Sequence, residues 1–317
     1  MTMAQDFTSA VPDQTSGTVF YVPPQGNLQQ RAMLKKLMRE FFDERGFLEV
    51  DTPVRIAGPA PEEYIDCIEA AGKFLRPSPE LEMKVLLAAG FPKIYQFGPC
   101  FRADEHGWKH REEFTMLEYY ITGCNYRELM QFTTDMICSS LRKVLQANTL
   151  DFHGRCVDLT APPEIITVAE AFERYCPMSM IEADQQDCFD ELMVTAIEPQ
   201  LGRGRLTYLT NYPANRASLA QLSAADPTVA ERWELYIEGV ELANAYGELT
   251  NGAEQLERFE KSREFRRQRG AAEYGEPAAF NDVLRRNALP VCSGCALGFD
   301  RLAMIAVNAS DISEVLF

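Results

Sequence analysis

A loop between two predicted strands carries the first residues suited to chemistry. Arg102 ends the segment 93–103, a polar loop with His110 follows, and Phe114 lies at the start of the segment 113–122. A guanidinium binds phosphate through paired hydrogen bonds and neutralises charge that builds at a reacting phosphorus. Phe114 offers a flat apolar face for adenine, and His110 can reach a distal phosphate. A solvated charged hairpin is the alternative, but the whole string favours a nucleoside triphosphate.

A glycine-bracketed segment near the C-terminus carries a second arginine. Within the segment 292–302, Gly294 and Gly298 permit close approach of the backbone to a ligand. Arg301 starts a predicted helix, where its guanidinium and the helix N-terminus can both face phosphate. A Gly-x-x-x-Gly spacing alone is weak, but Gly-x-Ala-x-Gly-x-Asp-Arg-Leu before an apolar helix is more specific. The segment therefore predicts a second phosphate contact.

Three glutamates recur at intervals of seven residues, at Glu234, Glu241 and Glu248. With a turn near Gly239, Glu234 and Glu241 are predicted to lie nearly opposite each other on paired strands. Two close carboxylates repel each other unless a cation is present, and Mg²⁺ on ATP phosphates prefers one or two carboxylates. A flat strand would put Glu248 on the other face, unless a bend at Gly247 re-aims it. The alternative is that all three are exposed strand carboxylates.

Helices and strands that position these residues are predicted from the apolar pattern. Apolar residues at helical spacing, followed by Gly46 as a left-handed helix stop, predict a helix over 28–45 before a short strand at 47–50. An amphipathic helix is expected over 125–146. The other expected elements are strands at 93–103, 113–122, 205–210, 231–249 and 293–297, and helices near 167–175, 188–198, 254–269 and 300–308. Antiparallel strands with helices distributed around them indicate one α+β domain.

The composition restricts the classes of protein to which the chain can belong. Its 317 residues are 46% hydrophobic and 25% charged, which is ordinary for a globular protein with a sizeable core. No apolar run approaches the roughly 20 residues that span a bilayer. Residues 1–27 lack a signal-peptide pattern and are rich in small and polar residues. We therefore expect a mostly disordered leader before a domain over 28–317.

The net charge and the cysteine content argue against an extended tRNA-binding surface, a disulfide framework and a zinc site. A formal net charge of −16 disfavours an extended tRNA footprint, because nucleic-acid binding relies on basic surface. A basic partner or a cationic small substrate suits this charge better. Nine cysteines, an odd number without a secretory signal, argue against a disulfide framework, and the Cys292/Cys295 pair lacks further zinc ligands. Buried, reduced thiols in a cytoplasmic protein without membrane association are predicted.

Three segments taken together in order, 46–53, 101–118 and 292–302, resemble motifs 1, 2 and 3 of the class II aminoacyl-tRNA synthetases. The similarity is to the lysyl subgroup and runs from about Leu28 to Leu316. It includes the segments Pro77–Lys84, Tyr212–Gln221 and Gly239–Thr250. The resemblance implies a catalytic core with an antiparallel sheet flanked by helices, and a homodimer with the first helix and strand at its interface. It also implies activation of an amino acid with ATP and Mg²⁺.

The same resemblance divides the matching residues between two substrates. Arg102 and Arg301 would be the catalytic groups that hold the α- and γ-phosphates, and Phe114 would stack on adenine. The other groups around ATP would be Asp104, Glu105 and His110, with Glu234 and Glu241 as the Mg²⁺ ligands. The amino-acid pocket would be lined by Ser78, Glu80, Glu118, Tyr120, Asn244, Glu248 and Ala296. In that pocket, Glu80 would take one amino group, and Glu248 with Tyr120 would receive the side-chain ammonium.

Within this family, the chain resembles the stand-alone paralogues that attach (R)-β-lysine to a lysine of elongation factor P. Lysyl-tRNA synthetases carry a large N-terminal domain that reads the anticodon, whereas 27 residues precede the predicted catalytic helix here. Ala296 stands where lysyl-tRNA synthetases have a glycine, and the ligases share that alanine. The implied reaction activates (R)-β-lysine, or lysine, as an adenylate and transfers it to elongation factor P. The choice between these amino acids rests on Ala296 alone.

Motif 2 departs from the family pattern around its loop. Ala103 and Asp104 replace Asn and Glu, and Arg111 and Glu112 replace Asn and Pro. Two alternatives stay open: a synthetase paralogue with another acceptor, such as a tRNA, a carrier protein or a small amine, and a non-catalytic paralogue that binds an amino acid and regulates a partner. Retention of the phosphate-binding arginines and the paired glutamates favours an enzyme.

Overall fold

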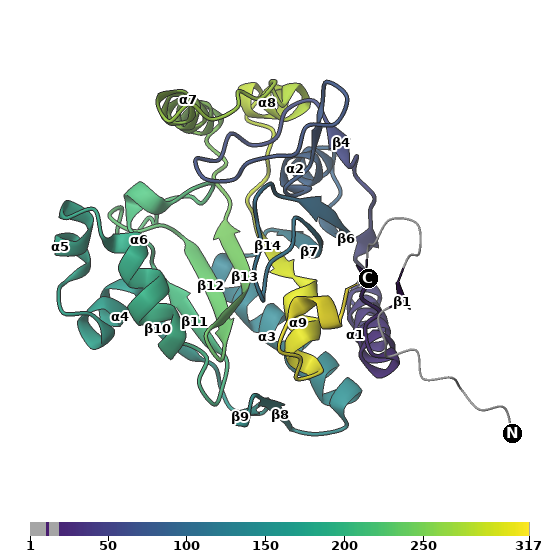
Figure 1. Ribbon diagram of the computed structural model, residues 1–317. Coiled ribbons are helices and arrows are strands. Elements are labelled where there is room, and N and C mark those ends of the chain that lie inside the picture. Colours follow the sequence, from purple (N-terminus) through teal and green to yellow (C-terminus); the bar gives the residue numbers. More distant parts are fainter. Residues whose placement is uncertain (1–10, 13–18, 317) are drawn as a thin grey trace, which may run out of the picture.

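The computed structural model describes residues 11–12 and 19–316 and is built around an eight-stranded sheet (Figure 1). In spatial order the strands are β10 (Glu164–Thr167), β11 (Thr207–Thr210), β12 (Arg232–Ile237), β13 (Val240–Gly247), β14 (Cys292–Gly298), β7 (Glu113–Thr122), β6 (Lys93–Phe101) and β3 (Leu48–Glu49). Neighbouring strands are antiparallel except at the two edges, where β10 runs parallel to β11 and β3 runs parallel to β6. The predicted α+β fold with a largely antiparallel sheet is confirmed.

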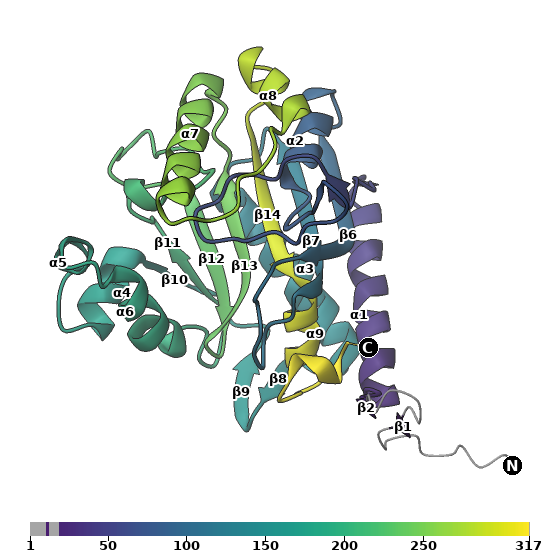
Figure 2. The same cartoon turned by 45° about the horizontal axis from the view of Figure 1, so that its top comes forward.

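Helices surround the sheet in three groups (Figures 1 and 2). The first group is α1 (Gln25–Asp43), α3 (Tyr126–Leu145) and α9 (Phe299–Ala306), the second is α2 (Glu80–Ala88), α7 (Gly252–Gln268) and α8 (Ala278–Arg285), and the third is α4 (Val168–Tyr175), α5 (Met180–Gln185) and α6 (Phe189–Leu192). Shorter helical turns are the π-helical η1 (Met193–Ile197) and the 3₁₀ turns η2 (Glu198–Gln200), η3 (Ala214–Arg216) and η4 (Ile312–Glu314). Within the described residues, no helix has the length and apolar content needed to cross a membrane.

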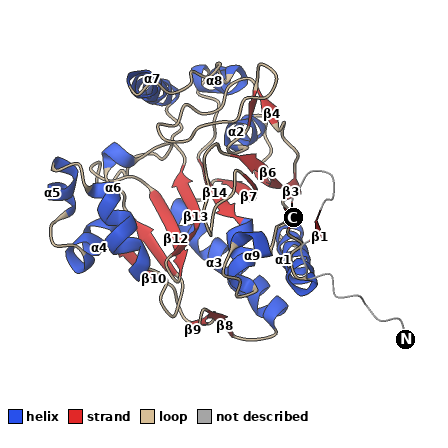
Figure 3. Cartoon of the chain, viewed as in Figure 1, coloured by secondary structure: helices blue, strands red, loops and turns tan. Residues whose placement is uncertain are grey.

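In the described part of the chain, three pairs of short strands lie outside the main sheet (Figure 3). These pairs are β1 (Val11–Pro12) with β2 (Val19–Phe20), β4 (Arg55–Ile56) with β5 (Phe74–Leu75), and β8 (Thr149–Phe152) with β9 (Arg155–Asp158). The first of these pairs, β1 with β2, falls inside the leader that was predicted to be mostly disordered. The rest of that prediction concerns residues 1–10 and 13–18, which lie outside the described residues.

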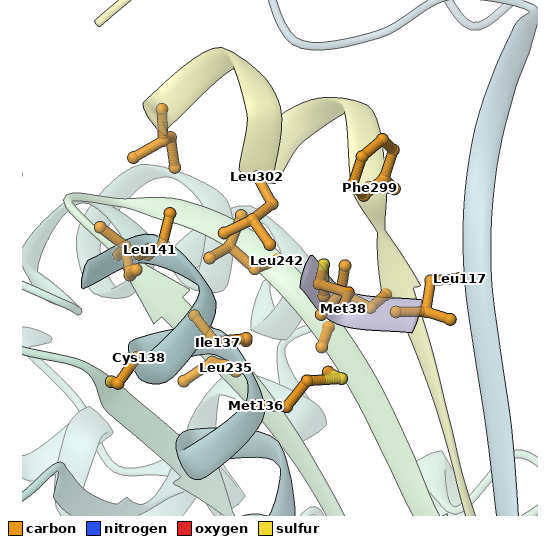
Figure 4. Close-up of a cluster of buried hydrophobic side chains, with 14 of the residues drawn as sticks. Met38, Leu117, Met136, Ile137, Cys138, Leu141, Leu235, Leu242, Phe299 and Leu302 are labelled. Carbon is orange, nitrogen blue, oxygen red and sulfur yellow. The ribbon is translucent and has the colours of Figure 1, made fainter. Parts of the chain in front are cut away.

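The main hydrophobic core lies between the sheet and helices α1, α3 and α9 (Figure 4). Met38 of α1 and Leu302 of α9 are fully buried there. On β7, Leu117 and Tyr119 belong to this core, so Glu118 between them points to the opposite face of the sheet. The helices thus cover one face of the central strands and leave the other face for polar side chains.

Local sequence signals explain the ends of the two longest helices. α3 begins with a capping box, in which the side chain of Asn125 accepts from the backbone of Glu128 and the Glu128 carboxylate accepts from the backbone of Asn125. It ends at Gln146, which has a φ of 53°. α1 begins at Gln25 rather than at residue 28, and Gly46 has the left-handed φ of 71° that the predicted helix stop requires.

Short elements account for most differences from the prediction. The strand expected at 47–50 is β3, with two residues. The helix expected near 188–198 is divided into α6, η1 and η2. Helices α2, α5 and α8 and the β8–β9 hairpin had no prediction, because segments of four to nine residues give too little periodicity to recognise. The longer helices and the other strands of the central sheet were predicted correctly to within a few residues, whereas the edge strand β10 was not predicted.

Candidate active site

A cavity of about 710 Å³ opens on the polar face of the sheet. It lies over β12, β13, β14 and β7, under the loop at residues 61–65 and beside the loop between β6 and β7. This volume is in the range of ligand-binding clefts. The predicted site residues that line it are Ser78, Glu80, Arg102, Glu105, His110, Phe114, Glu118, Tyr120, Glu234, Glu241, Asn244, Glu248, Ala296 and Arg301. Segments far apart in the sequence are thus brought to one cavity.

Asp104 is the predicted ATP contact that does not line the cavity. Its side chain is exposed, and its backbone N–H donates to the Glu112 carboxylate at 3.0 Å. The residue has a φ of 62°, which turns the loop just after Arg102. The structure therefore gives Asp104 a role in the turn of the loop, and the predicted contact finds no support in the geometry.

An extra residue on β13 brings its glutamates onto one face. The register between β12 and β13 shifts within these strands and leaves Leu242 without a partner. Such a β-bulge moves the alternation of side chains by one residue. Glu241 and Glu248, seven residues apart, consequently both line the cavity. The sequence analysis placed this change of direction at Gly247, but the structure places it at Leu242.

The bulge also offsets the two carboxylates that were predicted to face each other. Glu234 pairs with Asn244 and Glu241 pairs with Tyr236, so the two glutamates, predicted to lie nearly opposite each other, are offset by two residues along β12. Arg232 donates to Glu234 at 2.6 Å, and the Tyr236 hydroxyl donates to its other oxygen at 2.6 Å. Among the described residues, no group of three or more His, Cys, Asp or Glu could hold a metal ion. A cation at Glu234 and Glu241 would therefore need further oxygens from a bound ligand.

Arg102 is partly paired and keeps a free donor. Its Nη1 donates to Glu105 at 3.4 Å, while its Nε is buried without a hydrogen-bond partner. The guanidinium lies 5.3 Å from the centroid of the Phe114 ring. A buried polar atom without a partner is costly unless a ligand satisfies it. The geometry thus fits an anionic ligand at Arg102 with a flat group against Phe114.

Arg301 lies close to the second carboxylate. Its Nη1 donates to the backbone oxygen of Glu241 at 3.0 Å and to the Glu241 carboxylate at 3.2 Å. Burial and the Arg301 charge lower the pKa of His110, which favours a neutral imidazole there. Glu198 was not predicted. Burial, with repulsion from Glu241, raises its pKa to about 7, although Lys109 lies 4.0 Å away.

The carboxylates Glu80, Glu118 and Glu248 form an acidic cluster in the cavity wall. Glu118 accepts hydrogen bonds from the Tyr120 hydroxyl at 2.6 Å and from Ser78 Oγ at 2.8 Å. Burial, with repulsion from Glu80, raises the pKa of Glu118 to about 8. A buried carboxylate of this kind is stabilised in its charged form when a cation binds next to it. The cluster therefore suits a ligand that carries ammonium groups.

A buried lysine lies directly behind this cluster. Lys84 Nζ is 2.5 Å from Glu80 Oε1 and 2.5 Å from Glu248 Oε2. Burial raises the pKa of Glu248 to about 7, against the favourable charge of Lys84. Nearby, Asn244 Oδ1 is buried without a partner. Sequence reasoning gave Lys84 no role, although its spacing of four residues from Glu80 within a helix was a signal for an ion pair.

Two more charged residues of the cavity escaped the sequence analysis. Arg232 lies two residues before Glu234 on β12, a spacing that puts both on one face of a strand. Its Nε is buried without a partner. Glu62 lines the cavity from the loop between β4 and β5, and burial with repulsion from Glu80 raises its pKa. A loop residue has no periodicity, so the sequence held no signal for Glu62.

Gly294 leaves the space that two site residues occupy. A Cβ at this position would lie 2.1 Å from Tyr120 Cε1 and 2.7 Å from Glu248 Oε1. We expect Gly294→Ala to displace both side chains and to raise the KM for the amino acid about tenfold or more, with little change in the KM for ATP. Kinetics with each substrate varied in turn measures this, with Gly26→Ala as the control because a Cβ there meets nothing within 4 Å. An equal rise in both KM values would contradict the expectation.

The two cysteines of the CxxC pair belong to different clusters. Cys295 is buried in the core under α1, α3 and α9, whereas Cys292 is buried in the cluster formed with α2, α7 and α8. Their three-residue spacing on one strand puts them on opposite faces, so they cannot bind one ion. All nine cysteines of the chain lie in its described part and are free. Four of the nine are buried, four are partly buried and Cys156 is exposed, so the prediction of buried thiols holds for only part of them.

Comparison with known proteins identifies the class to which this fold and cavity belong. A family model described as "tRNA synthetases class II (D, K and N)" matches residues 23–317. The chain belongs to this family. The predicted resemblance to the class II synthetases is thereby confirmed.

Individual relatives indicate a subgroup of the family to which the chain is similar. A protein from Hamiltonella defensa named "Elongation factor P--(R)-beta-lysine ligase" is 36% identical over 310 residues, which cover 92% of this chain and 94% of that protein. Proteins of the same name from Yersinia enterocolitica and Yersinia pestis are 35% and 36% identical over 314 and 311 residues, with the same coverage. These relatives are ligases, and the chain is an enzyme of that class.

Proposed function

We propose that this protein activates (R)-β-lysine with ATP as an aminoacyl-adenylate and transfers it to a lysine side chain of elongation factor P. The observation that carries the proposal is that one cavity contains both a group of arginines and a cluster of carboxylates. Arg102 and Arg301 offer cationic groups suited to a triphosphate, and the acidic cluster offers carboxylates suited to ammonium groups. The names of the relatives support the choice of amino acid and of acceptor.

The first step needs orientation and charge neutralisation more than a protein nucleophile. The amino-acid carboxylate attacks the α-phosphorus in line, and the bond to the pyrophosphate oxygen breaks. Arg102, with its free Nε, would bind the α-phosphate and stabilise charge there. Arg301 would exchange its contact with Glu241 for the distal phosphate. Phe114 would support adenine, and Glu105 would keep Arg102 in place.

The residues present also fit the metal that the family uses. Glu234 and Glu241 supply hard oxygen donors in the cavity, and Mg²⁺ is commonly held by one or two carboxylates together with phosphates. When bound, the ion would neutralise charge on the phosphate oxygens. Arg232 and Tyr236 hold Glu234 in place for this purpose.

The second step joins the activated amino acid to the acceptor. The neutral ε-amine of an acceptor lysine attacks the adenylate carbonyl, the bond from that carbon to the phosphate oxygen breaks, and AMP leaves as the amine loses a proton. The acidic cluster would keep the amino groups of the bound amino acid in place during this exchange. The product is an amide on the acceptor lysine.

We further propose a cytoplasmic homodimer built through the first helix and strand. Two observations support the dimer: β3 is an edge strand of the main sheet, and Leu48 on β3 and Met33 on α1 are 49% and 48% exposed. An uncovered sheet edge beside apolar surface is suited to pairing with another copy. The free cysteines support a reducing compartment.

Binding of the amino acid should depend on pH between 6 and 8. Burial raises the pKa of Glu118 to about 8 and that of Glu248 to about 7, so both are partly protonated in the empty cavity near neutral pH. An ammonium ligand requires their ionised forms. We therefore expect the KM for the amino acid to fall by about tenfold or more as pH rises from 6 to 8. A KM that stays constant over this range would contradict the assignment of the acidic cluster to the amino groups.

The experiment that tests the function separates the two half-reactions. ATP–pyrophosphate exchange is measured with (R)-β-lysine, α-lysine and other cationic amino acids, and light scattering of the same preparation tests the dimer. A preference for (R)-β-lysine supports the proposal. Elongation factor P, tRNA and small amines are then offered as acceptors, and the products are identified by mass spectrometry. Absence of exchange with every lysine isomer would refute the proposal and favour a binding paralogue.

A further inference from the structure

The acidic cluster has a second layer formed by one lysine. Lys84 is 1% exposed and lies on α2 behind the cavity wall, whereas Glu80 and Glu248 line the cavity itself. Its ammonium is 2.5 Å from one oxygen of each carboxylate. Each carboxylate keeps a second oxygen for other partners. Lys84 therefore acts on a ligand only through Glu80 and Glu248.

The charges around this lysine can be counted. Glu80, Glu118 and Glu248 bring three negative charges when ionised, and Lys84 brings one positive charge, which leaves two negative charges. Buried charges are tolerated when they are paired. An amino acid with two ammonium groups brings the two positive charges that balance the cluster. An amino acid with one ammonium leaves one carboxylate unpaired or forces it to bind a proton.

The neighbouring glutamate, tyrosine, cysteine and phenylalanine side chains do not supply the positive charge that Lys84 supplies. Four more titratable side chains lie near the acidic cluster. Glu62 comes from the loop between β4 and β5, Tyr120 and Tyr246 come from β7 and β13, and Cys292 comes from β14. The Phe280 ring of α8 lies 6.0 Å from the ammonium. None of these groups is a cation, and burial raises the pKa of Glu62, which favours its uncharged form. Lys84 is the cation that faces Glu248.

We propose that Lys84 is a positioning residue that sets the preference of the site for amino acids with two amino groups. It fixes Glu80 and Glu248 so that each presents one oxygen to the cavity, and it cancels one of three negative charges. This inference rests on the proposed function, because it assigns the acidic cluster to the amino groups of the substrate. The competing interpretation is a purely structural ion pair that joins α2 to the end of β13.

Replacement of Lys84 by methionine tests the proposal, because methionine keeps much of the volume and removes the charge. At pH 7.5 we expect the KM for (R)-β-lysine or lysine to rise about tenfold or more, with kcat at saturation changed less than about threefold. The ratio of kcat/KM for the diamino acid over norleucine, which lacks the side-chain amine, should fall about tenfold. Loss of the cation removes a charge that lowers the pKa of Glu248, so the fall of KM with pH should move upward by about one pH unit.

The conservative variant Lys84→Arg separates charge from geometry. It keeps the positive charge, so the pH profile of KM should stay in place, while the altered spacing of donors raises the KM for the diamino acid. An unmoved pH profile in folded Lys84→Met, or an equal rise in KM for ATP and amino acid, would show a merely structural role. If Lys84→Met does not fold, an unchanged KM in Lys84→Arg overturns the proposal. Absence of exchange in the unmodified enzyme would instead refute the proposed function.

Discussion

Replacing Arg102 with alanine is expected to lower kcat/KM for ATP–pyrophosphate exchange by roughly a hundredfold to a thousandfold, or about 3 to 4 kcal/mol. The expected loss is large because Arg102 lies in the cavity wall with Nε buried and without a hydrogen-bond partner, and the proposed function assigns it to the α-phosphate. Its guanidinium also lies near the Phe114 ring. Alanine removes both the charge and the contact with the Phe114 ring, on which adenine is proposed to stack. Exchange kinetics at saturating amino acid measures the effect.

Two further variants define what Arg102 contributes. Arg102→Lys keeps the charge but loses the planar fork, so it should recover only part of the activity. Arg286→Ala is the matched control, because Arg286 is an exposed arginine outside the cavity lining that pairs with the exposed Asp282 at 3.0 Å. Surface pairs of this kind contribute little. Full activity in Arg102→Ala would exclude a role for this arginine in stabilising the transition state.

The parts of the fold that the sequence predicted are those with long, regular patterns. The apolar spacing of α3, with Asn125 before it, indicated a helix whose bounds agree to within a residue. β6 and β7 were located through their charged connecting loop. α5 and α8 have six and eight residues, too few for a clear apolar period; α5 does begin with a Ser179/Glu182 capping box, which the sequence analysis did not use, and α8 has no side-chain cap. Their positions depend on packing against other elements, which no local pattern records.

In the candidate site, too, the residues in recognisable motifs were predicted and those placed by distant contacts were not. Arg102 and Arg301 lie in motifs with a recognisable order, so their meeting in one cavity followed from the resemblance. The β-bulge at Leu242 depends on the register between β12 and β13. Its one signal in the sequence was the spacing of seven residues between Glu241 and Glu248, which an unbroken strand would place on opposite faces. Glu62 reaches the cavity from a loop, and loop conformation is set by contacts distant in sequence.

The cavity thus contains one cationic region and one acidic region, and the net charge of the chain indicates neither of them. The chain carries a formal charge of −16, yet Arg102, Arg232 and Arg301 converge on the space next to Glu241. The acidic cluster lies in the same cavity, with Lys84 behind it. Cations are thus concentrated where phosphate is expected and carboxylates where ammonium groups are expected. This local arrangement, rather than the overall charge, supports the choice of substrates.

Replacing Glu248 with glutamine is expected to lower kcat/KM for the amino acid by roughly a thousandfold, with the KM for ATP nearly unchanged. Glutamine has the same shape but removes a charge that pairs with Lys84 at 2.5 Å and that would bind the side-chain ammonium. The bound substrate ammonium would then lack its partner. Loss of one partner from a buried charge pair costs about 3 to 5 kcal/mol, because the remaining charge is left uncompensated. The amide NH₂ also presents a donor where the ammonium requires an acceptor.

The matched control is Glu257→Gln, because Glu257 is an exposed glutamate that pairs with Lys261 at 2.8 Å on α7. Exchange kinetics for both variants, with the amino acid and ATP varied separately, gives the two KM values. If Glu248→Gln kept its affinity for lysine isomers but lost selectivity against neutral amino acids, the charge would act in discrimination alone. If it kept both, Glu248 would serve only to hold Lys84, and the side-chain ammonium would have to be assigned to Glu118, whose pKa of about 8 leaves it ready to ionise when a cation binds.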